Sequence, residues 1–291
     1  MPNFQFQHIR IAGIASAVPT KVVKSTDFIS SFGEEAVRKF VEMTGVQEHR
    51  EVSEHQTASD LAFVAAEKLL REKQIDPADI RLLVFGSHSG DYRRPGTFSV
   101  LHKRLGLSKD CAAFDVGLGC SAFVYCIQTA ASMLSCSDAR MALVLVGETL
   151  SRLTYKEDRS TAMLFGDGGS AILLQKTEEE NAIQGKLCTD GTGYRAIIVP
   201  AGGFRNLEDT HDPMTWADGC TRTLYNTNMN GTDVFSFTIT KVPKTIKEFL
   251  DETKQDINEF DCLAFHQANR SRAESAIGAI KSPEPATIAS L

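Results

Sequence analysis

Short runs of β-branched and apolar residues alternate with amphipathic segments along this chain, and that alternation limits the folds it can adopt. Four elements are predicted in the middle of the chain: a strand at residues 112–116, a helix at 121–136, and strands at 141–146 and 169–174. This β-α-β-β order is typical of domains in which helices cover the faces of a sheet. We therefore expect an α/β fold.

The same alternation extends to both sides of this region. Toward the amino terminus, strands are predicted at residues 9–15 and 82–87, with helices between them, the second of which has Thr57 as its N-cap. After residue 175 we predict strands near Leu187 and at 196–199, a helix at 233–251 and a strand at 262–265. The second part of the chain therefore repeats the pattern of the first.

A polar, charged stretch at residues 176–181 separates these two parts. We predict a domain boundary there, between an amino-terminal domain at residues 1–175 and a carboxyl-terminal domain at residues 176–291. Residues 201–231 are rich in Gly, Asn, Thr and Asp, so they are predicted to form a long irregular surface loop. Ordered loops of this length often carry binding residues.

The charge and cysteine patterns argue against several classes of function. The formal net charge is −6 and no run of five or six like charges occurs, which disfavours nucleic acid or a membrane surface as a partner. The amino terminus has no signal-like segment, and no apolar run approaches the roughly 20 residues of a membrane span, so we expect a cytoplasmic protein. The seven cysteines form no C-x-x-C pair. The cysteines therefore predict neither a metal site nor disulfides. From the charge pattern we expect a small soluble substrate, and we expect no bound cofactor.

Residues 114–123, FDVGLGCSAF, combine a strand end, two glycines and the start of an apolar helix. Cys120 is predicted to lie at the first turn of that helix. The unpaired N–H groups and the dipole of a helix N-terminus favour the thiolate, which attacks carbonyl carbon, and can also face an oxyanion. Cys120 is therefore a candidate nucleophile. The alternative is a buried structural cysteine, which is what we expect of Cys126 and Cys136.

Residues 263–269, LAFHQAN, place His266 directly after a short apolar run. The carboxyl ends of strands in α/β folds point into the active-site crevice, so His266 is a candidate catalytic group. The alternative is a structural histidine whose ring nitrogens are hydrogen-bonded within the fold.

Glycines surround Asp167 in residues 164–171, but this stretch lacks both glycine-rich phosphate-binding patterns. We predict a tight turn before a buried strand, with the Asp167 side chain hydrogen-bonded to the turn.

Taken in order, these stretches resemble β-ketoacyl-acyl carrier protein synthase III and its relatives in the thiolase superfamily. The resemblance extends over residues 11–269. Its motifs lie at residues 44–50, 91–95, 113–123, 158–171, 229–235 and 265–269. In this comparison Cys120 occupies the family's acyl-cysteine position and His266 the position of its histidine.

The resemblance implies a duplicated thiolase-like fold of five α-β-α-β-α layers, in a homodimer whose loop at residues 91–95 helps to close the partner's acyl pocket. It also implies an acyltransferase of fatty acid or polyketide-like chain initiation, which moves an acyl group from acyl-coenzyme A to Cys120 and condenses it with malonyl-acyl carrier protein. His266 would donate a hydrogen bond to the malonyl thioester oxygen. Arg159 would bind the phosphates of coenzyme A.

Two features depart from the family pattern. Met43 stands where the best-known members often have a basic residue that contacts coenzyme A. The family also continues beyond its H-Q-A-N motif with a catalytic asparagine and two strands, whereas only 22 residues follow Asn269 and none of them is Asn. We therefore expect a second half that is incomplete at its carboxyl end, and we do not assign that asparagine's role to Asn269.

Two other functions stay open beside the condensing enzyme. One is a Cys-His enzyme that transfers or hydrolyses acyl groups without forming carbon–carbon bonds. The other is a non-catalytic subunit that pairs with an active paralogue, because a fold can be retained after its chemistry is lost.

Overall fold

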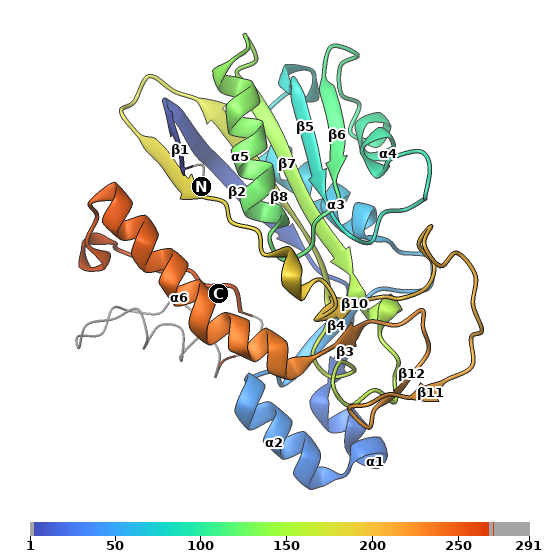
Figure 1. Cartoon of the computed structure of the whole chain (residues 1–291). Helices are drawn as coiled ribbons and strands as arrows, with labels where there is room; N and C mark the ends of the chain where they lie inside the picture. Colours follow the sequence, from blue (N-terminus) through green and yellow to red (C-terminus); the bar gives the residue numbers. More distant parts are fainter. Residues whose placement is uncertain (1–2, 268–269, 271–291) are drawn as a thin grey trace. The chain divides into compact units, whose positions relative to one another are not determined.

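The structure, a computed structural model, describes residues 3–267 and residue 270 of the 291-residue chain (Figure 1). The chain divides into two compact units, which we call unit 1 and unit 2. Unit 1 consists of Met1–Val22, Arg50–Arg152 and Gly166–Cys188, and unit 2 of Val23–His49, Leu153–Phe165 and Thr189–Leu291. The boundary predicted after residue 175 separates the two similar halves of the fold that the resemblance implies. It is a different division from these two units, and it stays a prediction.

Unit 1 is built on a five-stranded mixed sheet with the strand order β2-β8-β7-β5-β6. Its strands are β2 (Ile9–Ala17), β5 (Leu82–Gly86), β6 (Ala112–Val116), β7 (Met141–Thr149) and β8 (Asp167–Lys176). β5 runs parallel to β6 and β7, whereas β8 runs antiparallel to β7 and β2. All five strands lie where the sequence predicts them, and the α/β prediction is confirmed.

Helices cover both faces of this sheet (Figure 1). They are α3 (Ala58–Lys73), α4 (Thr97–Arg104) and α5 (Ala122–Ser135). Leu83 and Phe85 of β5 belong to the apolar cluster that contains α3 and α4, whereas Leu82 and Val84 belong to the cluster that contains α5. Burying one such side chain contributes about 1.5–3 kcal/mol. The alternation of side chains along the strands therefore holds a helical layer on each face.

The start of α3 confirms the predicted N-cap. Thr57 is the N-cap, and the Asp60 carboxylate accepts a hydrogen bond from its backbone N–H (2.8 Å). This contact satisfies a donor at the helix end that would otherwise need water.

Two glycines allow α3 to lie close to the sheet. A methyl group at Gly169 of β8 would come within 2.5 Å of the backbone nitrogen of Ala62, and one at Gly147 of β7 within 2.9 Å of the Ala58 carbonyl oxygen. Backbone atoms cannot yield to such contacts without moving the whole helix.

The sequence predicts a tight turn at residues 164–171, with the Asp167 side chain hydrogen-bonded to it. Asp167 instead begins β8, and its carboxylate accepts hydrogen bonds from the backbone N–H groups of Val52 and Ser151.

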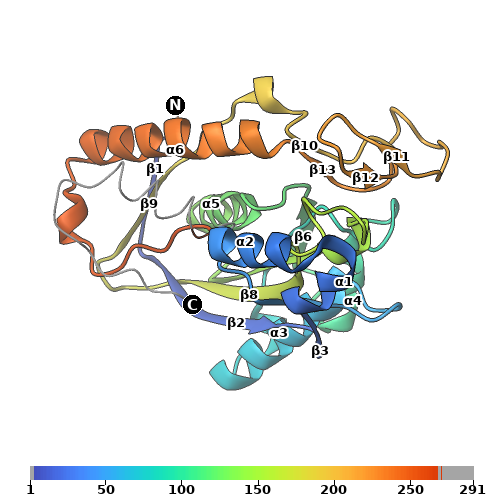
Figure 2. The same ribbon diagram turned by 90° about the horizontal axis from the view of Figure 1, so that it is seen from below.

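Unit 2 combines helices with very short strands. Its helices are α1 (Ile29–Phe32), α2 (Glu34–Thr44) and α6 (Gly231–Thr253), the last of which is seen from the side in Figure 2. The short strand pairs are β10 (Ile197–Ile198) with β13 (Asn228–Met229) and β11 (Met214–Thr215) with β12 (Thr221–Arg222). The Asn230 side chain caps α6 by accepting hydrogen bonds from the N–H groups of Thr232 and Asp233. The helix predicted at residues 233–251 is therefore confirmed.

Several elements differ from the prediction. The strands β1 (Asn3–Gln7), β3 (Lys21–Lys24) and β4 (Glu48–Glu51) were not expected; β1 pairs antiparallel with β9 (Ala182–Lys186) in unit 1. The strand predicted at residues 262–265 is wrong, because only Leu263 forms an isolated bridge. An apolar run becomes a strand only beside a pairing partner, and its local pattern does not supply one. The segment at residues 201–231 is confirmed as irregular, apart from the short strands above. The prediction that it lies on the surface is wrong in part, because Cys220, Arg222 and Thr227 are buried.

None of the helices in the described part of the chain is long and apolar enough to cross a membrane.

We expect Gly169→Ala to lower the free energy of unfolding by about 1–3 kcal/mol, because the added methyl group forces α3 away from β8. Chemical denaturation of the full chain measures this change. Gly191→Ala is the matched control: a methyl group there meets no atom within 4 Å, and we expect a change below about 0.5 kcal/mol. Equal stability of wild type and Gly169→Ala would show that the close approach is not required.

Candidate active site

Cys120 lies in the turn that connects β6 to α5. The backbone N–H of Ala122 donates to the Gly119 carbonyl oxygen (2.8 Å), and Ser121 is the N-cap of α5. The sequence predicts that Cys120 lies in the first turn of the helix. In the structure it lies just before the helix instead. Its side chain is exposed, whereas Cys126 within the helix is fully buried. Cys120 is therefore the more accessible of these two cysteines, although protein atoms also surround its sulfur.

Polar groups from three neighbouring parallel strands meet at this edge of the sheet. They are His88 and Ser89 after β5, Cys120 after β6 and Glu148 near the end of β7. The Glu148 carboxylate accepts hydrogen bonds from the backbone N–H of His88 (2.8 Å) and from the Ser89 hydroxyl (2.5 Å). The His88 imidazole packs against Gly119, where a methyl group would lie 3.0 Å from Nδ1. The turn that carries Cys120 thus has a carboxylate and an imidazole beside it.

The sequence analysis did not identify His88, Ser89 or Glu148. Each lies at or just beyond the end of an apolar strand, the same signal that was applied to His266. The carboxyl ends of parallel strands meet at one edge of a sheet, so these positions were recognisable from the sequence.

The electrostatic environment of Cys120 differs from the prediction. Burial of the sulfur among protein atoms raises the pKa of the thiol above its ordinary value, its own backbone N–H opposes this, and the Glu148 carboxylate raises it further. The net shift is therefore opposite to the predicted one, although the backbone N–H group acts in the predicted direction. Burial raises the pKa of Cys126 to about 12. Cys136, which was expected to be buried too, is exposed.

The two other candidate residues, His266 and Arg159, belong to unit 2. His266 lies in an irregular segment after α6, and its side chain is exposed. Arg159 is also exposed and follows the buried Asp158. Asn269 lies outside the described residues. The roles of His266 and Arg159 stay predictions.

Asp158 organises the turn that carries Arg159. Its carboxylate accepts hydrogen bonds from the backbone N–H of Ser160 (2.9 Å), the Ser160 hydroxyl (2.6 Å) and the Thr161 hydroxyl (2.9 Å). Its backbone carbonyl accepts a hydrogen bond from the N–H of Ala162 (2.9 Å). These bonds hold the turn around a buried charge and leave the Arg159 side chain outside.

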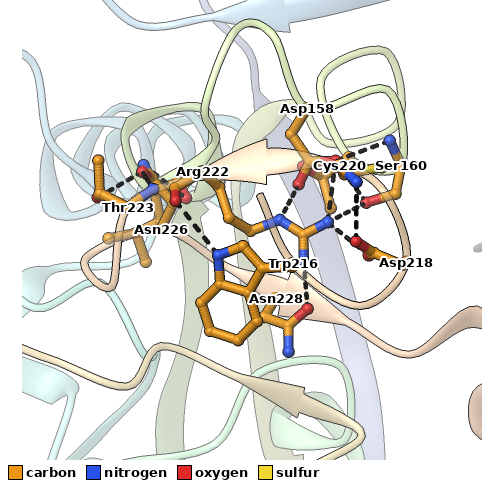
Figure 3. Close-up of polar contacts among 11 residues, drawn as sticks. Asp158, Ser160, Trp216, Asp218, Cys220, Arg222, Thr223, Asn226 and Asn228 are labelled. Atoms are coloured by element: carbon orange, nitrogen blue, oxygen red, sulfur yellow. Dashed lines mark hydrogen bonds and ion pairs between the residues drawn. The ribbon is translucent and has the colours of Figure 1, made fainter. Parts of the chain in front are cut away.

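A buried arginine balances the charge of Asp158 (Figure 3). The Arg222 side chain is 0% exposed; its Nε lies 2.7 Å from Oδ2 of Asp158 and its Nη2 2.6 Å from Oδ2 of Asp218. Nη1 donates to the Asn228 side-chain oxygen, and the guanidinium carbon lies 5.4 Å from the centre of the Trp216 ring. Burial by itself would lower the pKa of Arg222, but the two carboxylates outweigh it and the pKa is raised. Arg222 was not predicted as a site residue, because Asp158, the buried carboxylate that it pairs with, lies 64 residues away along the chain.

We expect Arg222→Met to lower the free energy of unfolding by about 3–5 kcal/mol, because it leaves the buried Asp158 carboxylate without a cation. Adding Asp158→Asn to this variant should recover part of the loss, since the uncompensated charge is then removed. Arg195→Met, at an exposed arginine of the same unit, is the control. Denaturant unfolding decides the matter, and wild-type stability of Arg222→Met would contradict the expected cost.

We expect Glu148→Gln to accelerate alkylation of Cys120 by iodoacetamide at pH 7 by roughly twofold to tenfold. Removing the carboxylate charge lowers the pKa of the thiol, so a larger fraction is thiolate at neutral pH. In both proteins the rate should rise about tenfold per pH unit below that pKa, with the variant's curve displaced to lower pH. Peptide mass mapping across a pH series gives the rates. Glu67→Gln on the exposed side of α3 is the control, and superimposable curves for wild type and Glu148→Gln would contradict the assignment.

Comparison with known proteins identifies the family. The family model for 3-oxoacyl-[acyl-carrier-protein] synthase III matches residues 114–191, which include Cys120. The β-ketoacyl-[acyl-carrier-protein] synthase III of Desulfitobacterium hafniense is 32% identical over 271 residues, 92% of this chain and 79% of that protein; the Xylella fastidiosa (strain Temecula1) protein is 33% identical over 265 residues, which are 89% of this chain and 76% of that protein. A crystal structure of a 3-oxoacyl-(acyl-carrier protein) synthase from Burkholderia xenovorans matches with a TM-score of 0.90 at 33% identity. The match covers 96% of this chain and 79% of the Burkholderia chain, and it confirms the thiolase-like fold. The chain belongs to the β-ketoacyl-acyl carrier protein synthase III family of acyltransferases.

Proposed function

We propose that this protein initiates fatty acid or polyketide-like chains by loading an acyl group from acyl-coenzyme A onto Cys120 and condensing it with malonyl-acyl carrier protein. The observation that carries the proposal is the exposed Cys120 thiol in the turn at the carboxyl edge of the parallel strands. This turn lies within the segment that the family model matches. An exposed nucleophile at a strand end is the arrangement that acyl transfer requires.

In the first step the Cys120 sulfur attacks the thioester carbonyl of acyl-coenzyme A. The new carbon–sulfur bond replaces the bond to coenzyme A, which leaves as its thiol with the proton that Cys120 gives up. Because burial raises the pKa of Cys120, a base has to take this proton while the bond forms. We assign this role to the His88 imidazole, which packs against Gly119 in the same turn.

In the second step malonyl-acyl carrier protein loses carbon dioxide, and the resulting enolate attacks the acyl-Cys120 carbonyl. A carbon–carbon bond forms as the Cys120 sulfur leaves. Negative charge grows on the malonyl thioester oxygen, and we assign the hydrogen bond to this oxygen to His266. The exposed guanidinium of Arg159 binds the phosphates of coenzyme A. The agreement of both positions with the family motifs supports these roles.

On the same family motifs we propose a homodimer in which residues 91–95 contact the partner's acyl pocket, and we place the protein in the cytoplasm as the sequence predicts. The backbone N–H of Asp91 donates to the Thr97 hydroxyl (2.9 Å), and its carboxylate accepts a hydrogen bond from the Ser59 hydroxyl (2.8 Å). Tyr92 next to it is 64% exposed. An anchored loop with an exposed aromatic residue suits a contact between proteins.

We expect Cys120→Ala to abolish acyl-enzyme formation and Cys188→Ala, at an exposed cysteine of the same unit, to leave it unchanged. His266→Ala should keep the acyl-enzyme but lower the rate of condensation by about a hundredfold to a thousandfold, because a preorganised donor to the oxyanion is lost. Mass spectrometry of the intact protein and chromatography of the β-ketoacyl-acyl carrier protein product provide the two measurements. Release of free acid by the wild type without ketoacyl product would favour the hydrolytic alternative. Absence of any acyl-enzyme would favour a non-catalytic subunit.

A further inference from the structure

Arg222 contacts both residues that flank Arg159 along the chain. Its Nη2 lies 3.3 Å from Oδ1 of Asp158 and 3.5 Å from the Ser160 hydroxyl oxygen, and its Nε lies 2.7 Å from Oδ2 of Asp158. One guanidinium therefore holds the residue before Arg159 and the residue after it (Figure 3).

The turn leaves little freedom to the backbone of Arg159. Asp158 and Ser160 also bond to each other twice, through the Ser160 N–H (2.9 Å) and the Ser160 hydroxyl (2.6 Å). The Cys220 thiol donates a hydrogen bond to the Asp158 carboxylate too, and burial together with the charges of Asp158 and Asp218 raises the pKa of Cys220. Arg159 itself is exposed, between a buried Asp158 and a half-buried Ser160.

Arg222 is itself held from several directions. Asp218 binds it at 2.6 Å, the Trp216 ring lies beside it at 5.4 Å, and the Trp216 Nε1–H donates to the Arg222 carbonyl oxygen at 3.2 Å. These contacts come from the hairpin formed by β11 and β12, so the Arg159 turn is fixed to that hairpin. A lysine cannot reproduce the contacts of the Arg222 side chain, because an ammonium group lacks the planar array of five donors.

We infer that Arg222 is a positioning residue for Arg159: it fixes the backbone on both sides so that the Arg159 guanidinium is presented to the phosphates of coenzyme A. The inference rests on the role proposed above for Arg159. Ordering a loop before the ligand arrives removes an entropic cost from binding. The contribution of Arg222 is therefore specific to the nucleotide part of the substrate.

Arg222→Lys tests this role, because it keeps the buried positive charge but loses the bidentate contact. We expect the dissociation constant of coenzyme A, measured by titration calorimetry on the full chain, to rise about threefold to tenfold. The affinity for pantetheine, which lacks the nucleotide, should not change. In the condensation assay the KM for acyl-coenzyme A should rise while kcat stays the same. In an Arg159→Ala background, Arg222→Lys should have no further effect on either quantity.

Controls separate this inference from the proposed function. Arg195→Lys is the matched substitution at an exposed arginine of unit 2 and should leave both affinities unchanged. If Arg159→Ala weakens coenzyme A binding and Arg222→Lys does not, the inference is wrong and the proposed function stands. If Arg159→Ala leaves coenzyme A binding unchanged, the proposed role of Arg159 and the inference are both wrong. Equal losses for coenzyme A and pantetheine in Arg222→Lys would mean a purely structural role and would also overturn the inference.

Ser160→Ala provides a second route if Arg222→Lys does not fold. It removes the hydroxyl contacts to Asp158 and Arg222 and leaves the ion pair intact. We expect it to weaken coenzyme A binding about twofold to threefold without changing pantetheine binding, since only one of the two flanking contacts is loosened. Wild-type affinity for coenzyme A in this variant would overturn the inference.

Discussion

Burial of the five-stranded sheet on both faces determines where unit 1 can place polar groups. Along β5, residues 82–85 are each at most 2% exposed, so a polar side chain there would lose water without gaining a partner. Along β5, polar side chains therefore begin only where the strand ends. Because β5, β6 and β7 are parallel, their carboxyl ends share one edge, and His88, Cys120 and Glu148 meet there. The glycines at 147 and 169 contribute by letting α3 cover the sheet closely.

Unit 2 contains a different kind of stabilising centre, in which charge replaces apolar burial. Removing Asp158 and Arg222 from water is costly, and that cost is offset by their ion pair together with the hydrogen bonds that neighbouring groups make to both residues. Two carboxylates surround one guanidinium, and hydroxyl and amide groups complete the set. Such a cluster has few alternative arrangements, since each change leaves a buried charge without a partner. It therefore suits a turn that has to keep one conformation.

The parts of the site that could be predicted are those that depend on neighbouring residues. The turn before α5 follows from the strand end, the two glycines and the apolar helix after them. This local pattern was enough to predict that Cys120 lies where the strand passes into the helix. The predicted direction of the shift in the pKa of Cys120 was wrong, because burial dominates it and Glu148, which arrives from another strand, adds to it. The strand expected at residues 262–265 failed for a similar reason, since strand pairing depends on a distant segment.

The sequence by itself determined the α/β class, the strands of unit 1, the position of Cys120 between a strand and a helix, and the motifs that mark the synthase III family. Apolar periodicity, glycine turns and ordered motifs are properties of neighbouring residues, which is why they can be read without a structure. Only the tertiary structure decided which groups surround the thiol and how Arg222 holds the turn of Arg159. Desolvation and Coulomb interactions depend on distances between segments that are remote in the chain, and those distances exist only in the folded molecule.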